Sequence, residues 1–146
     1  MNEKRFLEME LMLDIMNECG SVDLPVQGKS MRPFLKEGRD TIQLVKPDGQ
    51  FKKGDIVVYR RNEKYLLHRI VAVGTETVSI AGDDEFQPDT GVDRDRIVAV
   101  VSKIRRDGKI IDKNDIIWKF YSKIYINLQV RKTLVKANKM RRALGL

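Results

Sequence analysis

The chain has 146 residues, of which 42% are hydrophobic, a size and composition typical of one compact domain and not of a disordered chain. It contains one cysteine, Cys19, and one histidine, His68, which excludes an internal disulfide framework and zinc sites built from several Cys or His ligands. The net charge is +7, yet every acidic residue lies at or before Asp115. The basic character therefore belongs to the C-terminal part of the chain. We also expect no metal and no cofactor.

The N-terminal residues do not resemble a secretory signal peptide. They begin with a charged run, residues 2–5, and the next ten residues contain three acidic side chains: Glu8, Glu10 and Asp14. No stretch of about 20 apolar residues is present, so the sequence predicts no transmembrane helix. We therefore expect the protein in the cytoplasm, either free or peripheral to a membrane.

Residues 4 to 19 are predicted to form a helix that ends at Gly20. Its apolar residues recur at spacings of three and four: Phe6, Met9, Leu13 and Met16. We assign residues 1–22 to this N-terminal helical segment.

From Leu24 to about Asp112 the pattern changes to short strands separated by turn residues. The predicted strands cover residues 41–46, 56–60, 65–73, 77–81, 97–104 and 109–111, with a hairpin turn at Asp107-Gly108. Many short strands with close turns predict a mainly antiparallel β body, a barrel or a sandwich, which we assign to residues 23–113.

Residues 114–146 are predicted to form a basic helical tail. Its expected apolar stripe consists of Ile117, Tyr121, Ile124 and Leu128. Two interpretations stay open: a helix packed on the β body with a solvated basic face, and peripheral membrane contact of residues 115–142 with anionic lipid. A basic tail can also bind nucleic acid nonspecifically, but no recognition module accompanies it, so we expect no specific nucleic-acid partner.

The segment Val26–Leu35, with the sequence VQGKSMRPFL, carries the first candidate for chemistry. Gly28 permits close approach of another backbone, and Pro33 disfavours a helix at Arg32 and helps to fix the turn. A serine on such a loop exposes its hydroxyl, and the backbone N–H of Ser30 can face a developing oxyanion. The alternative is an ordinary turn between a helix and a strand.

His68 lies in the predicted strand at residues 65–73. Alternation places four of its residues on one face: Leu66, His68, Ile70 and Ala72. A histidine among aliphatic side chains is partly desolvated, which favours the neutral form that acts as a base. The alternative is a packed, hydrogen-bonded structural histidine.

An acidic loop with the sequence GDDEFQPD is predicted at residues 82–89. A carboxylate there can orient His68 and stabilise its protonated form, which is the third role in a serine triad. The alternative is a solvated turn. Residues 54–57, with the sequence GDIV, indicate a turn into a buried strand and carry no chemistry by themselves.

Taken together and in this order, the segments resemble the signatures of the type I signal peptidase family and the related self-cleaving repressor peptidases. The resemblance covers about residues 24–104. The segments that carry it are Gly28-x-Ser30-Met31-x-Pro33 (the nucleophile segment), Gly54-Asp55-Ile56-Val57 (the second signature), His68-Arg69 (the general base) and Gly82-Asp83 with Asp89 (the last signature).

The family divides by its base, which is lysine in the common bacterial enzymes and the repressors, and histidine in the endoplasmic-reticulum and archaeal type. With His68, this chain resembles the Ser/His branch. The resemblance implies that Ser30 is the nucleophile, with its backbone N–H on the oxyanion, and that His68 is the general base. It implies that Asp89 orients the imidazole, with Asp83 as the alternate.

The resemblance also implies that Gly28 and Met31 bind substrate. Many members carry serine or another residue at the position of Gly28, and if a serine hydroxyl there supplies an oxyanion donor, this chain lacks that donor. The implied function is a serine endopeptidase of the signal peptidase type, which cleaves an extended peptide or a leader segment by acyl-enzyme chemistry, with small side chains just before the cut.

Two other functions stay open. The first is a catalytically idle peptide-binding module on the same scaffold. The second, the C-terminal half of a transcriptional repressor, fits less well because the chain has neither an N-terminal DNA-binding domain nor the lysine base. Under the peptidase interpretation the expected partner is a peptide or a precursor protein.

Overall fold

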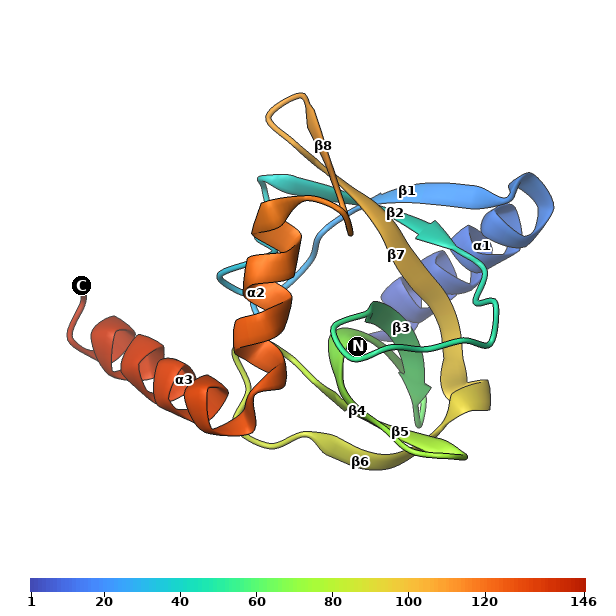
Figure 1. Ribbon diagram of the computed structural model, residues 1–146. Coiled ribbons are helices and arrows are strands. Elements are labelled where there is room, and N and C mark those ends of the chain that lie inside the picture. The colour runs from blue at the N-terminus through green and yellow to red at the C-terminus, as the bar shows by residue number, and fades with distance from the viewer.

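The computed structural model describes residues 1–146 and consists of an N-terminal helix, an eight-stranded antiparallel sheet and two C-terminal helices (Figure 1). The predicted mainly antiparallel β fold with flanking helices is confirmed. None of the helices combines the length and the apolar character that a membrane crossing requires. In chain order the elements are α1 (Glu3–Cys19), β1 (Ser21–Pro25), β2 (Asp40–Val45), β3 (Ile56–Arg61), β4 (Lys64–Val73), β5 (Thr77–Ala81), β6 (Asp89–Asp93), the 3-10 helix η1 (Arg94–Arg96), β7 (Ile97–Arg106), β8 (Lys109–Asp112), α2 (Ile116–Ile126) and α3 (Leu128–Ala143).

The sheet is curved and open. Its strand order is β1-β2-β7-β3-β4-β5-β6, with β8 paired to β7 as a hairpin that projects from the body (Figure 1). β1 and β6 are the two edges and do not pair with each other, so the sheet does not close into a barrel. An open edge at β1 leaves backbone groups that an extended peptide can use.

The two faces of the sheet bury two separate apolar clusters. The larger one has 15 buried residues and joins α1, α2 and the sheet through residues such as Met16 and Trp118. The smaller one has eight buried residues from β3, β4, β5, β6, β7 and Phe51. Alternation along β3 sends Val58 to the larger cluster and Tyr59 to the smaller one.

Helix α1 is capped at both ends, at Asn2 and at the predicted stop, Gly20. Asn2 accepts a hydrogen bond from the N–H of Arg5 at 2.9 Å, which satisfies a free donor of the first turn. Gly20 ends the helix in the left-handed conformation, with a φ of 90° and an N–H bonded to the Met16 carbonyl. This matches the expected helix and its stop.

The C-terminal tail differs from the predicted single stripe. Asn127 accepts hydrogen bonds from the N–H groups of Gln129 and Val130, so it ends α2 and begins α3 as a second helix. The buried residues of α2 are Trp118 and Tyr125. Leu128, expected in the stripe, is 45% exposed because it lies beyond this break. The predicted Tyr121 does pack against the larger cluster, and Ile117 and Ile124 are half-buried, so the tail packs on the body through most of the predicted stripe together with Trp118 and Tyr125.

Two further strand details differ from the expectation. A bulge in β4 between Ile70 and Ala72 reverses the alternation, so Ala72 is exposed while Val73 packs beside the smaller cluster. The end of the predicted acidic loop is strand β6, which begins at Asp89. Its sequence, DTGVD, has one buried apolar residue and no alternation that would predict a strand.

Candidate active site

The nucleophile segment predicted from the sequence lies in the connection between β1 and β2. Met31, Phe34 and Leu35 are buried in the larger cluster and anchor it, and the N–H of Leu35 bonds to the Met31 carbonyl at 2.9 Å. Ser30 precedes these anchors and is half-buried. The segment is thus held by apolar side chains on one side of Ser30, while the other side, at Gly28, is exposed.

The structure brings Ser30 and His68 together. His68 lies on β4, is 3% exposed, and its Nε2 is 3.1 Å from Ser30 Oγ. This is hydrogen-bond distance, which proton transfer between a hydroxyl and an imidazole requires. The backbone N–H of Ser30 makes no hydrogen bond within the chain, so it is free to bind a negatively charged oxygen.

The other ring nitrogen of His68 faces Tyr59 on β3. The Tyr59 hydroxyl lies 3.3 Å from His68 Nδ1 and donates to Asp89 Oδ2 at 2.5 Å. Asp89 also pairs with Arg61, whose Nη1 is 3.0 Å and 2.8 Å from its two oxygens. The predicted direct contact between Asp89 and His68 is therefore absent, and the phenol lies between the two groups.

Sequence reasoning missed Tyr59. In the β3–β4 ladder, Val57 is paired with His68, and Tyr59 is two residues further along the same face. The alternation of β3 was the signal that could have placed a tyrosine beside the histidine.

Asp83, the predicted alternate, is bound elsewhere. It is buried in a bidentate ion pair with Arg69, whose Nε and Nη2 lie 2.8 Å and 2.9 Å from its oxygens. Arg69 Nη1 also donates to the Gly54 carbonyl and to Ser122 Oγ on α2. Asp83 makes no hydrogen bond to His68, and its pair with Arg69 joins the predicted second and last signatures to α2.

A further carboxylate, Glu85, lies on the serine side of the imidazole. Its Oε1 is 3.5 Å from His68 Nε2, and its side chain is 42% exposed. Glu85 belongs to the predicted acidic loop at residues 82–89, but no role was predicted for it.

Burial lowers the pKa of His68 below its ordinary value, because the charged imidazolium is desolvated. The negative charges of Glu85, Asp89 and Asp83 oppose this shift, and Arg61 adds to it. The net direction keeps the imidazole neutral at neutral pH, which is the form that can accept a proton.

The loop at residues 82–86 rests directly on the nucleophile segment. The N–H of Asp84 donates to the Ser30 carbonyl at 2.8 Å. A Cβ on Gly82 would lie 2.8 Å from that same carbonyl oxygen, so only glycine fits. Helix α3 holds the loop from outside, because Arg131 donates to the carbonyls of Gly82 and Phe86 at 3.0 Å each. Arg142 adds an ion pair to Asp84 at 2.7 Å.

A hollow of about 570 Å³ contains both Ser30 and His68, and we call it the groove. Its lining is largely apolar and comes from α1, β1, β2, β3, β4 and the nucleophile segment. Gly28 and Met31, the predicted substrate-binding residues, belong to this lining. Helix α1 contributes one wall, including Met9 and Met12. Such a lining accommodates an extended chain with apolar side chains.

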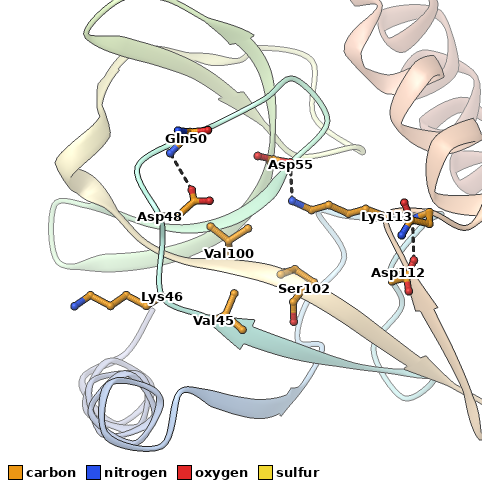
Figure 2. A pocket seen from close by; sticks show the side chains of 11 residues that line it. Val45, Lys46, Asp48, Gln50, Asp55, Val100, Ser102, Asp112 and Lys113 are labelled. Carbon is orange, nitrogen blue, oxygen red and sulfur yellow. Dashed lines mark hydrogen bonds and ion pairs between the residues drawn. The ribbon is translucent and has the colours of Figure 1, made fainter.

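A second hollow, of about 370 Å³, lies between β2, β7 and the start of the C-terminal segment (Figure 2). Neither Ser30 nor His68 lines it. Three of its charged groups already have partners within the chain: Lys113 Nζ lies 2.9 Å from Asp55, and Asp48 accepts from the N–H of Gln50, whereas Lys46 has none (Figure 2). The groove is therefore the candidate active site.

Residues 15–87, half of the chain, match the sequence profile of the signal peptidase family, peptidase S26. A similar curated protein is signal peptidase I P of Bacillus subtilis subsp. natto, which is 37% identical over 65 residues, 42% of this chain. That stretch is 35% of the relative's own length, so this chain matches about a third of it. No solved structure matches. The family match includes Ser30 and His68 and ends before Asp89 and the C-terminal helices.

Proposed function

Because the chain belongs to the signal peptidase family, peptidase S26, we propose that it is a serine endopeptidase that acts through Ser30 and His68. Its substrate is an extended peptide or the leader segment of a precursor protein. The observation that supports this most directly is the 3.1 Å separation of Ser30 Oγ and His68 Nε2 at the wall of the groove.

In the proposed mechanism, His68 Nε2 takes the hydroxyl proton as Ser30 Oγ bonds to the carbonyl carbon of the scissile peptide. The tetrahedral oxyanion binds the free N–H of Ser30, a type of contact whose loss typically costs about 100- to 1000-fold in rate. His68 then gives the proton to the leaving amine as the carbon–nitrogen bond breaks. Water, activated by the same imidazole, hydrolyses the acyl-enzyme and restores the serine.

The substrate is expected to lie along the open edge at β1, where Leu24 and Pro25 line the groove. The apolar lining favours apolar or small side chains over charged ones near the cut. Edge pairing supplies backbone hydrogen bonds, so the peptide's sequence matters mainly at the side chains that enter the groove.

The test compares the wild-type chain with Ser30→Ala and His68→Ala on a library of quenched fluorescent peptides, with cleavage sites read by mass spectrometry. Both substitutions should lower kcat/KM at least about 1000-fold while the circular dichroism spectrum and melting temperature stay near wild type. Substantial cleavage by Ser30→Ala would refute the assignment.

The catalytically idle peptide-binding module is the rival function. A serine-reactive covalent probe separates the two, because a nucleophilic Ser30 takes the label and an inert one does not. Peptide binding by the wild-type chain, without cleavage and without labelling, would favour the rival.

A further inference from the structure

The phenol of Tyr59 occupies the place between His68 and a carboxylate where a triad has a direct contact. We propose that Tyr59 is a positioning residue that sets the tautomer of His68 and connects its Nδ1 to Asp89. This inference rests on the proposed function of Ser30 and His68, and it adds a fourth member to the chain of hydrogen bonds that begins at the nucleophile.

The hydrogen-bond partners determine where the protons lie. Asp89 is ion-paired with Arg61, so its carboxylate only accepts, and the 2.5 Å contact requires Tyr59 to donate its single proton to it. The phenol oxygen then has only lone pairs to offer to His68 Nδ1 at 3.3 Å. Nδ1 must therefore carry the imidazole hydrogen.

That tautomer leaves Nε2 without a hydrogen on the side of Ser30, 3.1 Å from its hydroxyl oxygen. The opposite tautomer would put a hydrogen between Nε2 and Ser30, and the imidazole could not accept the serine proton. The phenol oxygen thus selects the tautomer of His68 that works as a base. Asp89 does not contact the imidazole and cannot do this by itself.

Four charged side chains surround the imidazole, and none of them contacts Nδ1 directly. Arg61 comes from β3, Asp89 from β6, and Asp83 and Glu85 from the loop after β5. Glu85, at 3.5 Å, is on the Nε2 side and has no contact with Nδ1. When His68 takes the proton from Ser30, its Nδ1–H donates to the phenol oxygen, and the charge is stabilised through Tyr59 by Asp89. The Tyr59 and Nδ1 protons stay on their own atoms throughout.

A purely structural role explains the ring of Tyr59 but not its hydroxyl. The side chain is 1% exposed and packs in the smaller cluster, which a phenylalanine would also do. Burial raises the pKa of Tyr59 far above its ordinary value, and the bond to Asp89 raises it further, so the phenol stays protonated. The hydroxyl of Tyr59 therefore stays a donor to Asp89 and an acceptor for His68 Nδ1, which is what the proposed positioning role requires.

The first experiment reads the tautomer directly and needs no substrate. His68 is the sole histidine, so long-range proton–nitrogen correlation spectra of the ¹⁵N-labelled full chain report this one imidazole without ambiguity. The wild type should show hydrogen on Nδ1 at neutral pH. Tyr59→Phe should lose this preference and give a mixture or the Nε2–H form.

The matched control is Tyr65→Phe. Tyr65 is also a buried tyrosine, on the neighbouring strand β4, but its hydroxyl bonds to Glu10 on α1. This variant should leave the His68 tautomer unchanged. Hydrogen on Nε2 in the wild type, or an unaltered tautomer in a folded Tyr59→Phe chain, would overturn the proposal.

The second experiment measures kinetics on the best peptide of the library. Tyr59→Phe should lower kcat about 10- to 100-fold, a part of the typical general-base contribution, with KM changed less than about twofold. Asp89→Asn should lower kcat in the wild type and add little in the Tyr59→Phe background, because the two groups act in series. If the losses in kcat caused by the two substitutions were additive, Asp89 would not act through Tyr59. If the wild type cleaves nothing, the proposed function fails, while the spectra still decide the role of Tyr59.

Discussion

Arg131 Nη2 donates a 3.0 Å hydrogen bond to the carbonyl oxygen of Gly82, although the two residues lie 49 positions apart in the chain. Arg131 is fully buried, and its guanidinium reaches from α3 to the 82–86 loop. The N–H of Asp84 in this loop donates to the Ser30 carbonyl. The position of the nucleophile segment is thus linked to a helix that lies outside the region matched by the family profile.

Arg131→Met should weaken this link while keeping most of the side-chain volume. The carbonyls of Gly82 and Phe86 lose a charged donor, and the first of these contacts is buried, so the free energy of unfolding should fall by about 2 to 3 kcal/mol. We expect kcat to fall as well, because the 82–86 loop, whose Asp84 N–H bonds to the Ser30 carbonyl, loses its support from α3. Chemical denaturation and peptide kinetics measure both effects. Lys132→Met, an exposed neighbour on the same helix, is the control and should change neither.

Substitution of Asp83 is predicted to lower mainly the stability, and substitution of Asp89 mainly kcat. Asp83→Asn leaves the buried guanidinium of Arg69 without its ion pair, which should cost about 3 to 5 kcal/mol of stability. Asp89→Asn breaks a half-exposed pair with Arg61 and should cost less than about 1 kcal/mol, with its main effect on kcat. Thermal melts beside kinetics separate the two. A stable, inactive Asp83→Asn chain would contradict the structural role of that residue.

Activity should be lost only in acid. Burial lowers the pKa of His68 from 6.5, so kcat/KM should rise with pH through a value below that and then level off. The carboxylate of Glu85 raises this pKa, so Glu85→Gln should move the acid limb to still lower pH. The pH profile of kcat/KM is the measurement. Glu63→Gln, an exposed change on the β3–β4 turn, should leave the profile in place.

The same pKa shift has a consequence for stability. The unfolded chain has the higher His68 pKa, so it binds a proton first as the pH falls below about 6.5. The contribution of the neutral imidazole to folding is therefore complete above that pH and is lost in acid. In denaturant titrations, His68→Gln should make stability less dependent on pH below about 6.5 than in the wild type.

Met12 provides a test of the groove. Met12→Trp places a large side chain on the α1 wall, so KM should rise about tenfold while kcat for bound peptide changes little. Leu11→Trp is the control, since Leu11 is exposed on the same helix and does not line the groove. An unchanged KM in Met12→Trp would show that peptides bind elsewhere.

Much of the fold could be predicted because its signals are local. The spacing of Leu13 and Met16 and the stop at Gly20 define α1, and alternation with turn residues defines most strands. The differences arise where tertiary contacts or single caps decide. Asn127 divides the tail into two helices, and β6 pairs with β5 despite a sequence with little strand preference.

The candidate site was predicted to the level of single residues but not of contacts. The spacing of the segments and their resemblance to the family implied that Ser30 and His68 lie close together, whereas the partner of each aspartate depends on the strand register and the loop path. Asp83 and Asp89 lie in one short segment, yet one binds Arg69 and the other meets Tyr59. No spacing rule in the sequence separates these outcomes, and the catalytic roles stay predictions.

Because Met1 and Arg5 line the groove beside the apolar wall of α1, anything joined to the amino terminus begins at the candidate active site. An affinity tag placed there would compete with peptides and imitate weak inhibition. At the other end, Leu146 is 80% exposed and comes after a helix that extends away from the sheet (Figure 1). A carboxyl-terminal tag without histidine is therefore the appropriate choice for every assay above, because His68 must stay the sole histidine.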